Sequence, residues 1–124
     1  MLGRITFNEL SESGIGRARG HLAFRNLQTH LAAESVEIDF AGQDLVSMSF
    51  LDELVLRLIE SNKLAKVVFV GSDPLVLEKL AQVAAIRNAT IFVQSKRGEL
   101  KRVLKPKPAT VISLKLPKAS GLGK

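Results

Sequence analysis

The hydrophobic pattern of this chain changes its period within one short stretch. Apolar and acidic residues alternate over 36–40, which predicts a strand with one face more buried than the other. After it the apolar positions recur at spacings of three and four, which predicts a helix over 49–62. Ser49 lies at the start of this helix, and Asp52 follows it at the spacing of an acidic capping box. We therefore predict that a strand leads into a helix whose N-cap is Ser49.

The rest of the chain alternates strands with helices in the same way. The other predicted elements are a strand at 4–7, a helix at 17–33, a strand at 66–71, a helix from 73 to about 88, and a strand at 90–93. The continuous apolar run of 66–71 is typical of a strand buried on both faces. Gly20 lies on the apolar face of the first helix, where glycine usually marks close packing against another element. The pattern predicts a small α/β domain with a mostly parallel or mixed sheet and packed helices.

Size and residue usage favour one folded domain. The chain has 124 residues, of which 46% are hydrophobic and 24% are charged. It contains no Cys, which excludes disulfides and thiolate metal sites. The N-terminus lacks the long apolar run of a signal peptide, and no stretch approaches the length needed to span a bilayer. We expect a cytoplasmic protein with no membrane partner.

The net charge of +6 is unevenly distributed. Residues 1–94 hold 9 Lys and Arg against 11 Asp and Glu, whereas residues 95–124 hold 9 Lys and Arg against Glu99 alone. We therefore divide the chain into an α/β domain at 1–94 and a basic C-terminal extension at 95–124. Within the extension, residues 111–116 alternate like one edge strand, and we expect the last residues to be disordered.

The basic extension suggests an alternative function, association with nucleic acid, because clustered Lys and Arg release counterions from phosphates. The residues considered for this role are Lys96, Arg97, Lys101, Arg102, Lys105 and Lys107. The extension has no aromatic side chain on which bases could stack, and it contains none of the usual folded reading modules. A solvated tail is the simpler interpretation.

A glycine-rich segment suggests a third alternative, nucleotide or small-molecule binding. Gly14, Gly16 and Gly20 resemble a dinucleotide-binding fingerprint. Asp39 lies near the offset expected of a ribose ligand. However, the third glycine of that fingerprint would fall on Arg19, and these glycines do not follow directly after a strand. We favour a loop followed by a close-packed glycine.

No set of residues points to catalysis or to a metal ion. His21 and His30 are nine residues apart on one predicted helix, so they point away from each other. Asp52 and Glu53 are adjacent on a helix and point to different sides, so they cannot act together as an acid–base pair. An ion pair between Glu53 and Arg57, one turn apart, is the simpler interpretation. We predict that the protein is not an enzyme and needs no cofactor.

Residues 38–54 carry a longer motif, Ile38-Asp-Phe-x-Gly-x-x-x-Val46-Ser-x-Ser49-Phe-x-Asp-Glu-Leu54. This motif resembles the STAS-like domains, a bacterial family of unknown function related to the sulfate-transporter and anti-sigma-factor-antagonist domains. The resemblance covers roughly residues 11–94. It implies a non-catalytic, regulatory protein–protein interaction in bacterial signalling, with a histidine-kinase-like ATPase or another signalling protein as the partner. A homodimer is also compatible with this resemblance.

The resemblance bears on the serines at the predicted helix start. In the antagonist proteins this strand leads into Asp-Ser-Ser-Gly-Leu, and a partner kinase phosphorylates the second serine. Here the first four motif positions fall on Ser47, Met48, Ser49 and Phe50, so only the phosphorylated serine agrees. Ser49 is therefore either a cap, worth on the order of 1 kcal/mol, or a phosphorylation switch at a helix N-terminus. Ser47 is the second candidate for these roles. The charge of Asp52 would repel a phosphate, which favours the cap.

The side of this helix opposite its apolar stripe is a candidate surface for partner docking. The stripe centres between Phe50 and Ile59 at 100° per residue. Leu56 falls near the opposite side, among acidic residues. The predicted docking face consists of Asp52, Glu53, Leu56 and Glu60. A single exposed leucine is also ordinary on a protein surface, so both interpretations stay open.

Overall fold

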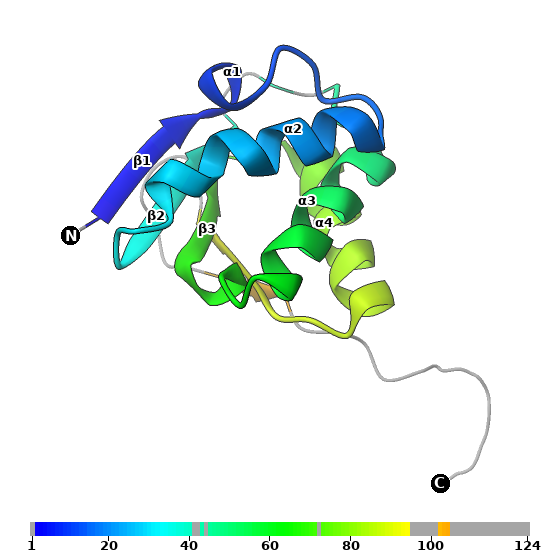
Figure 1. Ribbon diagram of the computed structural model, residues 1–124. Coiled ribbons are helices and arrows are strands. Elements are labelled where there is room, and N and C mark those ends of the chain that lie inside the picture. The colour runs from blue at the N-terminus through cyan, green and yellow to red at the C-terminus, as the bar shows by residue number, and fades with distance from the viewer. Residues whose placement is uncertain (1, 41–42, 44, 72, 95–101, 105–124) are drawn as a thin grey trace, which may run out of the picture.

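The computed structural model describes residues 2–40, 43, 45–71, 73–94 and 102–104 (Figure 1). The elements in this part of the chain are, in order, β1 (Leu2–Thr6), α1 (Phe7–Leu10), α2 (Arg17–Leu27), the 3-10 helix η1 (Gln28–His30), β2 (Ser35–Asp39), α3 (Met48–Glu60), the 3-10 helix η2 (Leu64–Lys66), β3 (Val67–Val70), α4 (Pro74–Arg87), β4 (Ile91–Gln94) and β5 (Arg102–Leu104). None of the helices in this described part has the length and apolar character required to cross a membrane.

The five strands form one sheet in the order β1-β2-β3-β4-β5. The first four are parallel, and β5 runs antiparallel to β4. Because consecutive parallel strands are neighbours and their crossovers are right-handed, α2, α3 and α4 lie on the same face of the sheet (Figure 1). The predicted α/β fold, a largely parallel sheet with packed helices, is therefore confirmed.

The hydrophobic core lies between this face of the sheet and the helices. Val36 and Ile38 of β2 point into it and are fully buried, as the alternating pattern predicted. All four residues of β3 are buried, in agreement with its continuous apolar run. Phenylalanines from separate parts of the chain meet in this core. The ring centroid of Phe7 is 5.1 Å from that of Phe40 and 5.5 Å from that of Phe50, and the centroids of Phe40 and Phe69 are 5.8 Å apart. Helix α3 is the most deeply embedded helix, because α2 and α4 flank it on either side.

Gly20 allows α2 to lie directly against α3. A Cβ atom at this position would be 2.5 Å from the carbonyl oxygen of Phe50 and 3.0 Å from Cβ of Glu53. The first distance involves backbone, which cannot turn away as a flexible side chain could. The prediction that Gly20 marks a close contact between two elements is confirmed.

Helix α3 begins earlier than its apolar pattern predicted. Its first residue is Met48, and its N-cap is Ser47 rather than Ser49. Ser47 has an extended backbone, with φ −82° and ψ 158°, and its Oγ accepts a hydrogen bond from the N–H of Phe50 at 3.1 Å. The prediction was wrong because the apolar stripe begins at Phe50, whereas the polar residues of the first turn carry no periodic signal.

Two boundaries near the N-terminus also differ. Strand β1 ends at Thr6, which forms a capping box with Glu9 and starts the short helix α1, whereas the strand was predicted to reach residue 7. Helix α2 ends at Leu27 and gives way to η1, so the predicted helix over 17–33 is too long. A 3-10 turn after an α-helix is a common way to end it, and it has no distinct sequence pattern.

Strand β5 lies within the segment that the charge pattern assigned to the basic extension. Its three residues pair with Ile91–Val93 of β4, so the sheet continues past residue 94 and includes Arg102. The strand expected at 111–116 lies outside the described residues. So do the other basic residues considered for nucleic-acid binding, which are Lys96, Arg97, Lys101, Lys105 and Lys107.

Candidate functional site

The candidate site begins where the loop before α2 meets the N-terminus of α3. The hydroxyl of Ser47 accepts from the N–H of Phe50 at 3.1 Å and from the N–H of Gly16 at 2.9 Å. The N–H of Ser47 donates to the carbonyl of Gly14 at 2.8 Å. One serine therefore caps α3 and anchors the glycine loop that starts α2.

This packing explains the glycine-rich segment without a nucleotide. A Cβ atom on Gly14 would lie 2.8 Å from the carbonyl oxygen of Leu45, so the two loops touch through their backbones. Gly16 has φ +93°, a conformation that L side chains rarely adopt. Both glycines have a structural reason for their identity.

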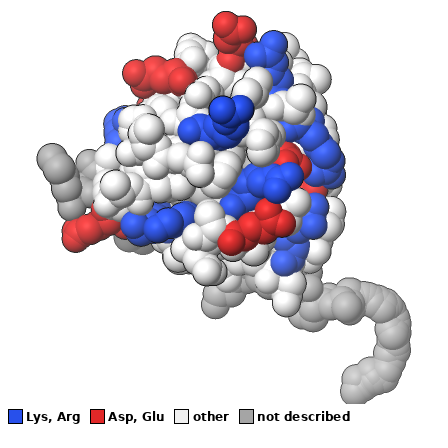
Figure 2. All heavy atoms as spheres, in the orientation of Figure 1, with Lys and Arg blue, Asp and Glu red and all other residues white. Residues whose placement is uncertain are grey.

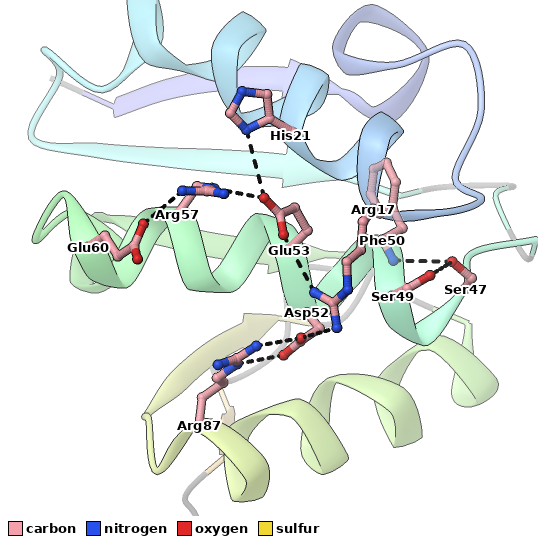
Figure 3. Close-up of polar contacts among 10 residues, drawn as sticks. All are labelled: Arg17, His21, Ser47, Ser49, Phe50, Asp52, Glu53, Arg57, Glu60 and Arg87. Atoms are coloured by element: carbon pink, nitrogen blue, oxygen red, sulfur yellow. Dashed lines mark hydrogen bonds and ion pairs between the residues drawn. The ribbon is translucent and has the colours of Figure 1, made fainter.

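Ser49 lies in the first turn of α3, in the second helical position. Its Oγ is 3.1 Å from Oγ of Ser47, and its side chain is half-buried (Figure 3). It faces an open groove of about 390 Å³, which we call the Ser49 groove. The groove is lined by Arg17, Met48, Ser49, Asp52, Ile86 and Arg87, from α2, α3 and α4.

Asp52 projects from α3 toward two arginines of other helices. Arg87 of α4 donates from Nε and Nη2 to its two carboxylate oxygens, each at 2.7 Å, and Nη2 of Arg17 of α2 lies 2.8 Å from the same carboxylate. The residue is only 6% exposed. The hydrogen bond from Arg87 is the main cause that lowers the pKa of Asp52, against the opposing effect of burial. Asp52 is therefore ionised and charge-compensated at neutral pH.

Glu53, also 6% exposed, has a separate set of partners on the other side of α3. Nε of Arg57 donates to it at 2.7 Å, which confirms the predicted pair within the helix. Nη1 of Arg17 lies at 3.5 Å and Nδ1 of His21 at 3.7 Å. Burial by itself would raise the pKa of Glu53, but the hydrogen bonds and charges of Arg57 and Arg17 outweigh it and lower that pKa.

We call this set the arginine network: Arg17, Arg57 and Arg87 with Asp52, Glu53 and Glu60 (Figure 3). It ties α2, α3 and α4 together through one arginine of each. The carboxylates of Asp52 and Glu53 are at the inside of the network, and the guanidinium groups are at its surface. Side-chain exposure is 9% and 8% for these acids but 54%, 37% and 30% for the three arginines.

The acidic docking face predicted on α3 is thereby corrected. Asp52 and Glu53 are buried and paired, Leu56 is half-buried, and Glu60 is exposed but bound to Arg57 at 3.0 Å. The periodicity of α3 alone could not reveal that α2 and α4 cover it on both sides. Partner docking on this side of the domain stays a prediction, but the surface offered consists of arginines and Glu60, with Asp52 and Glu53 beneath them.

A second open groove, of about 520 Å³, lies between α2 and α3, and we call it the His21 groove. It is lined by Arg17, Ala18, His21, Leu22, Glu53 and Arg57. Arg17 lines both grooves and separates them. His21 and His30 fall in different elements, and in the described part of the chain no group of three or more His, Cys, Asp or Glu could hold a metal ion.

Residues 21–77 match the family model of the STAS-like domain of unknown function (DUF4325). The resemblance that the motif of residues 38–54 indicated is confirmed over this stretch, which runs from α2 into α4. The STAS-like segment contains Ser47, Ser49 and both buried acids. No curated protein and no solved structure matches the chain.

The sequence interpretation missed Arg17 and Arg87 as members of the site. Each lies 35 residues from Asp52, so no local spacing connects them. The sequence nevertheless indicated that cationic partners from other elements were needed. Two adjacent acids in the most amphipathic helix require cationic partners if neighbouring helices bury them, because an unpaired buried carboxylate is costly.

Proposed function

We propose that this STAS-like domain is a non-catalytic, regulatory protein–protein interaction module of bacterial signalling, acting in the cytoplasm and switched at Ser49. The observation that carries the proposal is the position of Ser49. It is half-buried in the first turn of α3, in a groove that it shares with Arg17 and Arg87. The family resemblance suggests a histidine-kinase-like ATPase or another signalling protein as the partner.

The roles of the two serines separate in this arrangement. Ser47 already accepts two backbone N–H groups, so its hydroxyl is needed for the local structure. Ser49 is not the cap, which removes the main reason to assign it a purely structural role. A phosphate on Ser49 would meet the positive end of the helix dipole and two guanidinium groups.

The repulsion expected from Asp52 is also reduced. That carboxylate is held by three short contacts with Arg87 and Arg17, so its charge is compensated before any phosphate arrives. Phosphorylation would then reverse the charge at the mouth of the Ser49 groove and alter the affinity for a partner that contacts it. The chemistry requires no catalytic group from this chain, because the kinase supplies the reaction.

The test is affinity capture from the native host with wild type, Ser49→Ala and Ser49→Asp, together with mass spectrometry of phosphosites. We expect Ser49→Ala to retain the partner and Ser49→Asp to lose or exchange it. Thr90→Asp is the matched control, since Thr90 is exposed just before β4, at the end of the parallel sheet opposite Ser49. A folded Ser49→Asp variant that retains the same partners as wild type would count against the switch.

A further inference from the structure

We propose that the Ser49 groove and the His21 groove form one docking surface for an acidic peptide segment of a partner protein, anchored by aliphatic side chains. This inference rests on the proposed function, because it names the chemistry of the partner. Together the grooves present arginines at the surface, one large exposed aliphatic side chain each, and a shared wall at Arg17.

The charge of the surface follows from the depth of its ion pairs. The carboxylates of Asp52 and Glu53 are directed inward, so the outer layer of the network consists of the three guanidinium groups and of Glu60, which is itself bound to Arg57 (Figure 3). Figure 2 shows Lys and Arg atoms next to Asp and Glu atoms on this face of the molecule. Glu60 lines neither groove, so a ligand that enters them meets guanidinium groups with the carboxylates of Asp52 and Glu53 beneath them.

The arginines also retain donors for a ligand. Arg87 uses Nε and Nη2 on Asp52, and Arg57 uses Nε on Glu53 and Nη1 on Glu60. Within the described residues, no acceptor bonds to Nη1 of Arg87 or to Nη2 of Arg57. The same guanidinium can thus hold an internal carboxylate and bind a second one from outside, in the planar geometry that suits carboxylates.

Each groove adds an apolar contact next to an arginine. Ile86 in the Ser49 groove is 66% exposed, and Leu22 at the His21 groove is 42% exposed. Exposed aliphatic residues occurring singly are common. Here Leu22 belongs to α2 and Ile86 to α4, the two helices that flank α3, so one extended or helical segment could place an aliphatic side chain against each while its carboxylates contact the arginines.

Two other occupants fit this surface less well. Nucleic acid would share the anionic charge, but the chain has no Trp or Tyr, and no Phe lines either groove. The imidazole of His21 is then the one aromatic ring in the two grooves, so successive bases would lack a row of aromatic side chains to stack on. A second copy of this chain, docked by the same surface, would bring arginines against arginines. An acidic peptide satisfies both the charge and the apolar contacts.

The proposal is tested by selecting binders from a phage-displayed library of random twelve-residue peptides on the wild-type protein. We expect enriched sequences to combine several Asp or Glu with two aliphatic residues. The affinity of the most enriched peptide, synthesised with a fluorescent label, is then measured by anisotropy against wild type and variants, each checked for folding by circular dichroism. Affinity should fall as salt is raised, because much of the attraction is electrostatic.

Three variants test whether the peptide binds at the two grooves, and a fourth serves as the control. Asp52→Asn combined with Arg87→Gln keeps the net charge and leaves no buried carboxylate unpaired, and it should weaken binding roughly tenfold. Ile86→Gln and Leu22→Gln should each weaken it about three- to tenfold. Leu75→Gln is the matched control, because Leu75 is 60% exposed on the same helix as Ile86 but lines neither groove. It should bind like wild type.

Several results would overturn the proposal. The first three are a selection without enrichment, enriched peptides without an excess of Asp and Glu, and equal affinity of the peptide for all variants. The fourth is displacement of the labelled peptide by a single-stranded DNA oligonucleotide at a lower concentration than the unlabelled peptide requires. None of these affects the Ser49 capture experiment. If capture shows partners that depend on Ser49 but the library yields no acidic binders, the regulatory function stands and the acidic docking surface does not.

Discussion

The two sides of α3 are held by different kinds of contact. Toward the sheet it presents Phe50, Leu54 and Leu58, all fully buried in the aliphatic core. Toward α2 and α4 it presents Asp52 and Glu53, which are also buried but are paired with arginines. The apolar side requires only neighbours of suitable shape. The polar side requires particular partners, and removing one of them leaves a charge in a place that water cannot easily reach.

This difference has a consequence for function. A charge added at the surface has little effect on apolar side chains that pack against the sheet. It can act on the arginine network, because the guanidinium groups of that network are exposed to solvent. A new anion at Ser49 would lie next to Arg17 and Arg87, the same arginines that hold Asp52. The polar side is therefore the part of α3 where a signal could be read.

The largest expected loss of stability is at Gly20, where α2 packs directly against α3. Gly20→Ala places a Cβ against the backbone of Phe50 at a distance of 2.5 Å, and it also approaches Glu53. We expect this substitution to lower the free energy of unfolding by about 3 kcal/mol, despite the better helix propensity of Ala. Urea denaturation measures it. Gly3→Ala is the control, because a Cβ at Gly3 meets nothing closer than 3.6 Å. Equal stability of the two variants would contradict the close approach of α2 and α3.

The next effect concerns the bidentate pair between α3 and α4. Arg87→Leu leaves Asp52 buried with Arg17 as its remaining partner, and we expect a loss of about 2 kcal/mol in the free energy of unfolding. The double replacement Asp52→Asn with Arg87→Leu should recover much of this loss, since it removes the uncompensated charge. Additive losses in this double-mutant cycle would mean that the two residues do not interact.

Replacing each of the two serines by Ala should give smaller losses of stability, and the two losses should be unequal. Ser47→Ala removes the acceptor for two backbone N–H groups, so it should destabilise by about 1–2 kcal/mol. Ser49→Ala removes one contact between hydroxyls and should cost less than about 0.5 kcal/mol. Thermal unfolding distinguishes the two variants. The reverse order would restore Ser49 as the cap and would also weaken the argument for a switch.

The smallest expected effect is a dependence of stability on pH. The folded state holds the pKa of Asp52 and that of Glu53 below their ordinary values, so the unfolded state binds more protons at low pH. Their contribution is complete above the ordinary pKa values, near 4, and is lost as the pH falls through the lower folded values. Wild type should therefore lose more stability on acidification than Asp52→Asn with Arg87→Gln. Identical pH profiles from urea titrations would show that Asp52 contributes little to this linkage.

Much of the fold could be predicted from local pattern. The alternation over β2, the apolar run of β3 and the residues Asp73 and Pro74 at the start of α4 each specify an element through a few neighbouring residues. Gly20 was also identified correctly, because a glycine on the apolar face of a helix is costly unless another backbone needs the space. Parallel topology followed from the order of these elements and the handedness of their crossovers.

The site depended on the tertiary structure. The sequence identified Ser47, Ser49, Asp52 and Glu53 as polar residues at the start of a helix, and it predicted the pair of Glu53 with Arg57. It could not show which serine would bind the loop before α2, or which arginines of the other helices would pair with the acids. Those partners lie more than 30 residues away along the chain, and hydrophobic periodicity describes only one helix at a time. Burial is a property of neighbours that the sheet brings together. For this reason the acidic face predicted from one helix is, in the folded domain, a surface of arginines with Asp52 and Glu53 beneath them.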